Sequence, residues 1–73
     1  MKLNIETTDA AATLKVLQQV FINEDVSVGT EYDNTADFVI KPQGAGDNDE
    51  YVYPAESIIE LAAVIPPYKI RIY

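Results

Sequence analysis

One short stretch, residues 42–51 (PQGAGDNDEY), concentrates residue types that could do chemistry. Its acidic run at 47–50 puts oxygen-bearing side chains where a calcium-binding loop begins. Such a loop then needs an oxygen ligand at its fifth position, a glycine at its sixth and a glutamate at its twelfth. This chain has Tyr51, Val52 and Ile58 there. We therefore interpret the stretch as a solvated loop that holds no metal.

Two other chemistries also fail on residue type and spacing. The segment Gly44-Ala45-Gly46 is too short for a glycine-rich phosphate loop, and the acids after it would repel a phosphate. Glu56 and Glu60 share a helix face by spacing, but a catalytic carboxylate pair needs a pocket that makes the two acids behave differently. The chain has no His and no Cys, which are common catalytic bases and nucleophiles. We predict no enzymatic activity, no catalytic residue and no cofactor.

Tyrosines interleaved with acids are the remaining pattern, in TEYDNTADF (30–38) and GDNDEYVYP (46–54). Tyrosine supplies a large contact area at little entropic cost, and acids steer a basic partner towards it. The alternative is that each tyrosine only covers an edge of the core with its hydroxyl in water. As a group they predict a partner-binding surface, made of Glu31, Tyr32, Asp33, Asp37, Asp47, Asp49, Glu50, Tyr51 and Tyr53.

The charge of the chain restricts what that partner is. Twelve acids and five bases give a net charge of −7. Such a chain is repelled by nucleic acid and by anionic membranes, and is attracted to basic surfaces. Binding of RNA through the sheet is also disfavoured, because Phe38 is expected to point inward while Asp37 points outward on the same strand.

Periodicity indicates the elements that carry these residues. Strands are predicted at 2–7, 26–32, 36–41 and 68–73, where polar and apolar residues alternate or β propensity is high. Helices are predicted at 10–23, after the Thr8-Asp9 cap, and from 54 to 65, before Pro66-Pro67. Turns are predicted at 23–25 and 33–35, and residues 51–53 are a candidate fifth strand.

This order predicts a single α+β domain over residues 1–73, of ferredoxin-like β-α-β-β-α-β type. It has one antiparallel four- or five-stranded sheet with two helices on one face. The rival is an α+β domain with a five-stranded meander through residues 51–53.

Alternation also assigns the two faces of that sheet. The outward face carries a basic corner of Lys2, Lys69 and Arg71, with acids gathered on the opposite side at 24–25, 31–37 and 47–50. The inward, core-forming set is Leu3, Ile5, Ala10, Leu14, Leu17, Val20, Phe21, Val26, Val28, Tyr32, Ala36, Phe38, Ile40, Ile58, Leu61, Ala62 and Ile65.

In size, acidity and lack of Cys and His, the chain resembles the small acidic inhibitors encoded by bacteriophages, which include DNA mimics and anti-CRISPR proteins. The resemblance covers composition only. It implies a phage protein that is a non-enzymatic binder and occludes a basic, nucleic-acid-binding surface of a partner protein. The partner is therefore expected to be a nucleic-acid-binding protein or complex, with no direct contact to nucleic acid or membrane.

A second hypothesis is a small structural or regulatory module that forms homo-oligomers through its edge strand, because an edge invites pairing and a small core gains from dimerisation. The N-terminal residues lack the apolar segment of a signal peptide, and no apolar run reaches the ~20 residues that span a bilayer. A cytoplasmic location is expected.

Overall fold

The computed structural model describes residues 1–44 and 55–73 of the chain. The candidate fifth strand at 51–53 lies outside these residues. In chain order the elements are β1 (Lys2–Glu6), α1 (Ala10–Val20), β2 (Glu24–Glu31), β3 (Thr35–Pro42), α2 (Ala55–Val64), a 3₁₀ turn η1 (Pro67–Lys69) and β4 (Ile70–Ile72).

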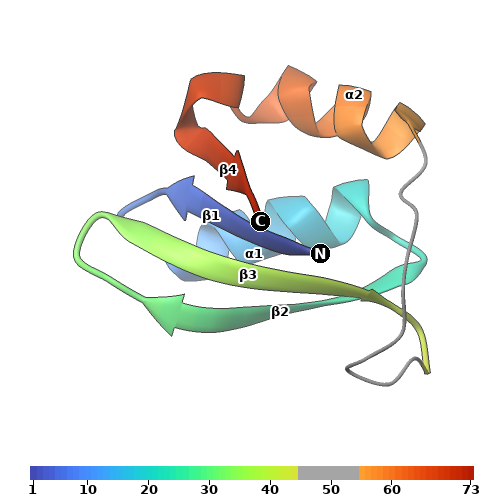
Figure 1. Cartoon of the computed structure of the whole chain (residues 1–73), viewed down its shortest axis with the longest axis horizontal. Coiled ribbons are helices and arrows are strands. Elements are labelled where there is room, and N and C mark those ends of the chain that lie inside the picture. Colours follow the sequence, from blue (N-terminus) through green and yellow to red (C-terminus); the bar gives the residue numbers. More distant parts are fainter. Residues whose placement is uncertain (45–54) are drawn as a thin grey trace.

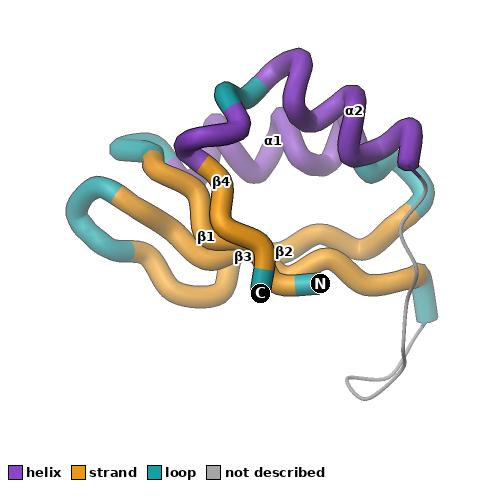
Figure 2. The backbone as a smooth tube through the Cα atoms, turned by 45° about the horizontal axis from the view of Figure 1, so that its top comes forward, coloured by secondary structure: helices purple, strands orange, loops and turns teal. Residues whose placement is uncertain are grey.

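The four described strands form one antiparallel sheet in the order β2-β3-β1-β4 (Figure 1). Both helices lie on the same side of this sheet, and no described helix or strand covers the other side (Figure 2). The molecule is therefore a small α+β fold with one four-stranded antiparallel sheet and two helices. That arrangement is consistent with the ferredoxin-like class.

The first helix begins where the sequence predicts and ends earlier. Asp9 caps it, because the Asp9 carboxylate accepts a hydrogen bond from the Ala12 N–H at 3.0 Å. At its C-terminus the Phe21 N–H donates to the Leu17 carbonyl at 2.8 Å. The predictions of a helix to residue 23 and a turn at 23–25 are wrong. Glu24 and Asp25 already belong to β2, because pairing with Pro42 and Lys41 of β3 extends the strand.

The C-terminal strand is shorter than predicted. Residues 67–69 form the 3₁₀ turn, in which the Lys69 N–H donates to the Pro66 carbonyl at 2.9 Å. Proline fixes its own φ near the helical value, so Pro67 favours this turn over an extended chain. Regular pairing with β1 starts at Ile70, which lies opposite Ile5.

The core lies between the sheet and the helices. Alternate residues of the two central strands point into it, where they meet Leu17 and Phe21 of the first helical segment and Leu61 of α2. The prediction of inward residues is confirmed for the fully buried set, which is Leu3, Ile5, Leu17, Phe21, Ala36, Phe38, Ile40 and Leu61. Ala62 is exposed, so its predicted place in the core is wrong: α2 packs against α1 and the core through the side that carries Leu61 and Ile65.

The N-terminus is tied to the same central pair of strands. The Met1 ammonium donates to the Ile40 carbonyl at 2.7 Å, and the Ile40 N–H donates back to the Met1 carbonyl at 2.9 Å. Burial of the Met1 ammonium lowers its pKa below the ordinary value of 8.0.

Phe38 is a test of this core. Replacing it by Ala should lower the free energy of unfolding by about 3–5 kcal/mol, because a fully buried ring leaves a cavity. The matched control is Ile22→Ala, at a side chain that is 74% exposed, which should change the same quantity by no more than ~0.5 kcal/mol. Urea unfolding followed by circular dichroism measures both, and equal losses would contradict the assignment of the core.

Candidate functional site

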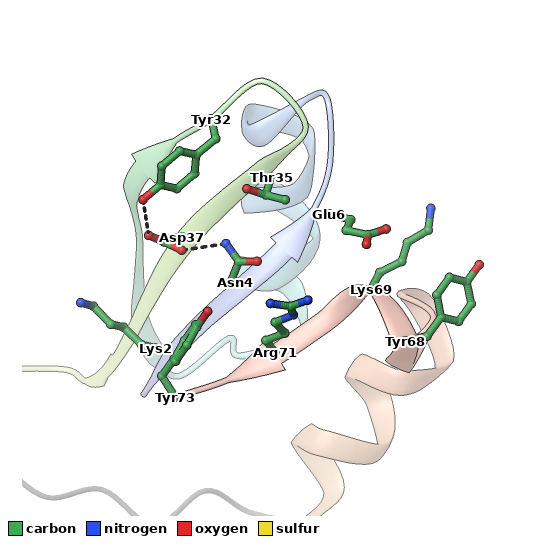
Figure 3. Close-up of a pocket in the computed structure, with 10 residues that line it drawn as sticks. All are labelled: Lys2, Asn4, Glu6, Tyr32, Thr35, Asp37, Tyr68, Lys69, Arg71 and Tyr73. Carbon is green, nitrogen blue, oxygen red and sulfur yellow. Dashed lines mark hydrogen bonds between the residues drawn. The ribbon is translucent and has the colours of Figure 1, made fainter.

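The face of the sheet that no helix covers carries an open concavity of about 570 Å³ (Figure 3). It is built by outward-pointing residues of three strands and by the chain flanking them. Polar, charged and aromatic side chains line it, namely Lys2, Asn4, Glu6, Tyr32, Thr35, Asp37, Tyr68, Lys69, Arg71 and Tyr73.

A β-bulge brings Tyr32 to this face. Val28 lies opposite Phe38 and Glu31 opposite Ala36, so β2 has one extra residue between these pairs. One extra residue reverses which side chains face the core. The prediction that Tyr32 shares the inward face of Val26 and Val28 is therefore wrong: Tyr32 is 56% exposed and lines the open concavity.

Asp37 joins two strands and the bulged segment through its carboxylate. The Asn4 side-chain amide of β1 donates to Asp37 Oδ1 at 2.8 Å, and the Tyr32 hydroxyl lies 3.4 Å from Asp37 Oδ2, to which it donates a long hydrogen bond (Figure 3). Asn4 and Asp37 are direct partners in the β1–β3 register. The bond to Asn4 is the firmer of the two, because the contact to Tyr32 is long and exposed.

The three residues of the predicted basic corner do lie near one another. β1 and β4 pair, and Lys2, Lys69 and Arg71 all line the concavity. They do not converge on one point: Figure 3 shows the Lys2 and Lys69 ammonium groups on opposite sides, with Arg71 between them. No hydrogen bond or ion pair joins the Arg71 side chain to another residue in 1–44 or 55–73. Such divergent cations form no chelating site for one small anion.

Five of the nine described acids lie on the β2–β3 hairpin, away from β4, namely Glu24, Asp25, Glu31, Asp33 and Asp37. The prediction that acids lie on the side opposite the basic corner agrees with the described stretches at 24–25 and 31–37, which occupy opposite ends of the hairpin: Glu24 lies opposite Pro42 and Glu31 opposite Ala36. Four of the predicted partner-binding residues, Glu31, Tyr32, Asp33 and Asp37, fall in or beside the hairpin turn. The other five, Asp47, Asp49, Glu50, Tyr51 and Tyr53, lie outside the described residues.

Reasoning from sequence missed Tyr68, Thr35 and the position of Tyr32 in the concavity. The sequence predicts a strand from residue 68, whereas a 3₁₀ turn places Tyr68 beside the sheet. For Tyr32 the signal was weak: Gly29 interrupts an otherwise regular alternation and is compatible with a bulge.

No group of three or more acidic side chains that could hold a metal ion occurs within 1–44 and 55–73. Neither helix in the same part of the chain is long and apolar enough to cross a membrane.

No protein-family model, no curated protein and no solved structure matches this chain. The site therefore has to be interpreted from its own residues.

The contact between Asn4 and Asp37 can be measured by a double-mutant cycle of Asn4→Ala and Asp37→Ala. We expect a coupling free energy of about 0.5–1.5 kcal/mol, as for a charge-assisted hydrogen bond that is partly buried. Tyr32→Phe should change stability by less than ~0.5 kcal/mol, because its hydrogen bond is long and exposed. Urea unfolding gives all values, and strict additivity in the cycle would argue against the contact.

Two glycines differ in whether their backbone conformation requires glycine. Gly29 has an ordinary backbone, and an added Cβ would lie 3.5 Å from the Asp37 carbonyl oxygen, so Gly29→Ala should be neutral or stabilising by up to ~1 kcal/mol. Gly44 has φ of 74°, so Gly44→Ala should destabilise by about 1–2 kcal/mol. Thermal unfolding of both variants tests this, and the reverse order of stability would contradict the backbone described here.

Proposed function

We propose that this protein is a non-enzymatic acidic binding protein that occludes a basic, nucleic-acid-binding surface of a partner protein, as phage-encoded DNA-mimic and anti-CRISPR inhibitors do. One observation carries the proposal: exposed acids follow the length of the β2–β3 hairpin, with the exposed Tyr32 next to the acids of its turn.

The hairpin carries negative charge along its length and on both faces: Asp25 lies opposite Lys41 on the open side, and the bulge turns Glu31 to the helix side, opposite the buried Ala36. Asp25 and Glu31 lie six residues apart on β2, which corresponds to roughly 20 Å along a strand. Asp33 continues this charge into the turn, and all three residues are exposed. A groove that binds a nucleic-acid backbone offers an extended row of cations. Carboxylates spread along an edge strand fit such a groove better than a compact acidic cluster would.

Tyr32 adds contact area to this charge. A tyrosine ring has few side-chain torsions to restrict, so it loses little conformational freedom when a partner binds it. The acids would then govern the rate of encounter and the tyrosine the lifetime of the complex.

The fold and the location form part of the same proposal. We assign the chain to the ferredoxin-like class, supported by its β-α-β-β-α-β element order and by the strand order β2-β3-β1-β4. A single domain of this kind acts as a rigid carrier for the hairpin, in the cytoplasm, where nucleic-acid-binding proteins are abundant.

The test begins with capture from a nuclease-treated bacterial lysate, to identify a protein that binds the chain without bridging nucleic acid. That protein, once purified, is loaded with a labelled DNA duplex, and the chain is titrated against it. At low salt we expect displacement of the duplex, and an affinity at least tenfold weaker for the Glu31→Gln/Asp33→Asn variant, about 1.4 kcal/mol. The difference should shrink as salt rises, because exposed charges are screened.

The matched control is Glu56→Gln/Glu60→Gln, which removes two exposed charges from α2 and leaves the hairpin unchanged. It should bind within twofold of the native chain. The Asp47→Asn/Asp49→Asn/Glu50→Gln variant measures the second acidic stretch separately. If the hairpin variant and the triple variant both bind as tightly as the native chain, the acidic residues are not the binding surface and the proposal fails.

A further inference from the structure

The backbone of β4 is hydrogen-bonded to β1 on one side only. The Tyr73 N–H donates to the Lys2 carbonyl at 2.9 Å, so these two residues form a hydrogen-bonded pair of the antiparallel ladder. Hydrogen-bonded and non-hydrogen-bonded pairs alternate in such a ladder. Arg71 therefore bonds to Asn4, its register partner, whereas the backbone groups of Ile70 and Ile72 point away from β1.

Most of those outward groups have no partner in the described part of the chain. The Ile70 N–H is used, because it donates to the Pro67 carbonyl. The Ile70 carbonyl and both backbone groups of Ile72 remain at the rim of the sheet, where β4 is the last strand. An edge of this kind is a template for another strand.

The side chains beside this edge are exposed to solvent. Ile72 is 57% exposed although it points to the helix side of the sheet, and Tyr73 is 72% exposed on the other side. Arg71 is exposed next to it. The other edge strand, β2, differs, because a bulge and acidic residues at both ends discourage pairing there.

We propose that β4 pairs with β4 of a second copy of this chain, in antiparallel orientation about a two-fold axis at Ile72. In this register Ile72 and the partner's Ile72 form a hydrogen-bonded pair, so their outward N–H and carbonyl groups satisfy one another. Each two-fold contact of this type is self-complementary and closes at two copies. The product is one continuous eight-stranded sheet.

Charge and ring chemistry select this register. It places Arg71 opposite the partner's Tyr73 on the open face, as a non-hydrogen-bonded pair whose side chains lie close together. A guanidinium over a phenol ring is an attractive cation–π contact. The two-fold axis generates this contact twice, once from each copy. The register centred on Arg71 instead sets two arginines against each other, which is repulsive. On the helix side the two Ile72 side chains meet across the axis and shield each other from water.

Single-cysteine variants read this register directly, because the native chain has no Cys. Hydrogen-bonded partners have Cα atoms about 5.5 Å apart, within the range that a disulfide spans. We expect Ile72→Cys to oxidise to a disulfide-linked dimer. Arg71→Cys should form it at least tenfold more slowly, since diagonal partners are ~7–8 Å apart. Ile22→Cys, at a side chain that is 74% exposed against 57% for Ile72, lies beyond the end of α1; it is the control for random collision and should be as slow as Arg71→Cys.

Sedimentation equilibrium of the unmodified chain provides the second measurement. We expect a reversible species of twice the 8.1 kDa mass. Ile72→Pro should weaken association at least tenfold while circular dichroism stays native, because proline is tolerated at a sheet edge whose N–H faces outward. Arg71→Glu should also weaken it.

Three results would overturn the proposal: a native chain that stays monomeric at millimolar concentration, a dimer unaffected by Ile72→Pro, or faster cross-linking through residue 71 than through residue 72. A monomer would leave the β4 edge for a strand of a different protein. Dimerisation is independent of the hairpin, so Glu31→Gln/Asp33→Asn should dimerise like the native chain.

Discussion

The pairing of β1 with β3 is the interaction on which the rest of the molecule depends. Leu3 and Ile5 lie opposite Phe38 and Ala36, and all four are fully buried on the helix side. The same register brings Asn4 to Asp37 on the open side. β2 attaches to β3 and β4 to β1, so each edge strand owes its position to this central pair. A chain of 73 residues without disulfides has few other means of fixing its shape.

The sequence was most informative where one residue's environment is set by local alternation. The buried positions of β1 and β3 follow from period-two patterning, and the cap at Asp9 follows from residue type. It was least informative where pairing with a distant strand decides the outcome. Glu24 and Asp25 resemble a turn locally but are extended by Pro42 and Lys41, and Tyr32 changes face because of one extra residue in β2. Neither effect is encoded within a short window of sequence.

The candidate surface was predictable in its charges and not in its shape. Strand adjacency was enough to place Lys2, Lys69 and Arg71 near one another. The concavity needs Tyr32 on the open face and Tyr68 on a 3₁₀ turn, and both depend on backbone irregularities. For Asp37 the sequence pattern and the structure supply different parts of the description. The pattern identified it as outward and acidic, and the structure adds that it is bonded to Asn4 and Tyr32.

The two edge strands lie far enough apart for substitutions in them to act independently. β2 and β4 are separated by β3 and β1, which corresponds to roughly 14 Å across the sheet. Sites this far apart with no shared partner usually contribute additively to the free energy. A substitution in the acidic hairpin and one at the β4 rim should therefore change the free energy independently, without epistasis between them. Selection could then retune either edge of this small sheet while leaving the other as it is.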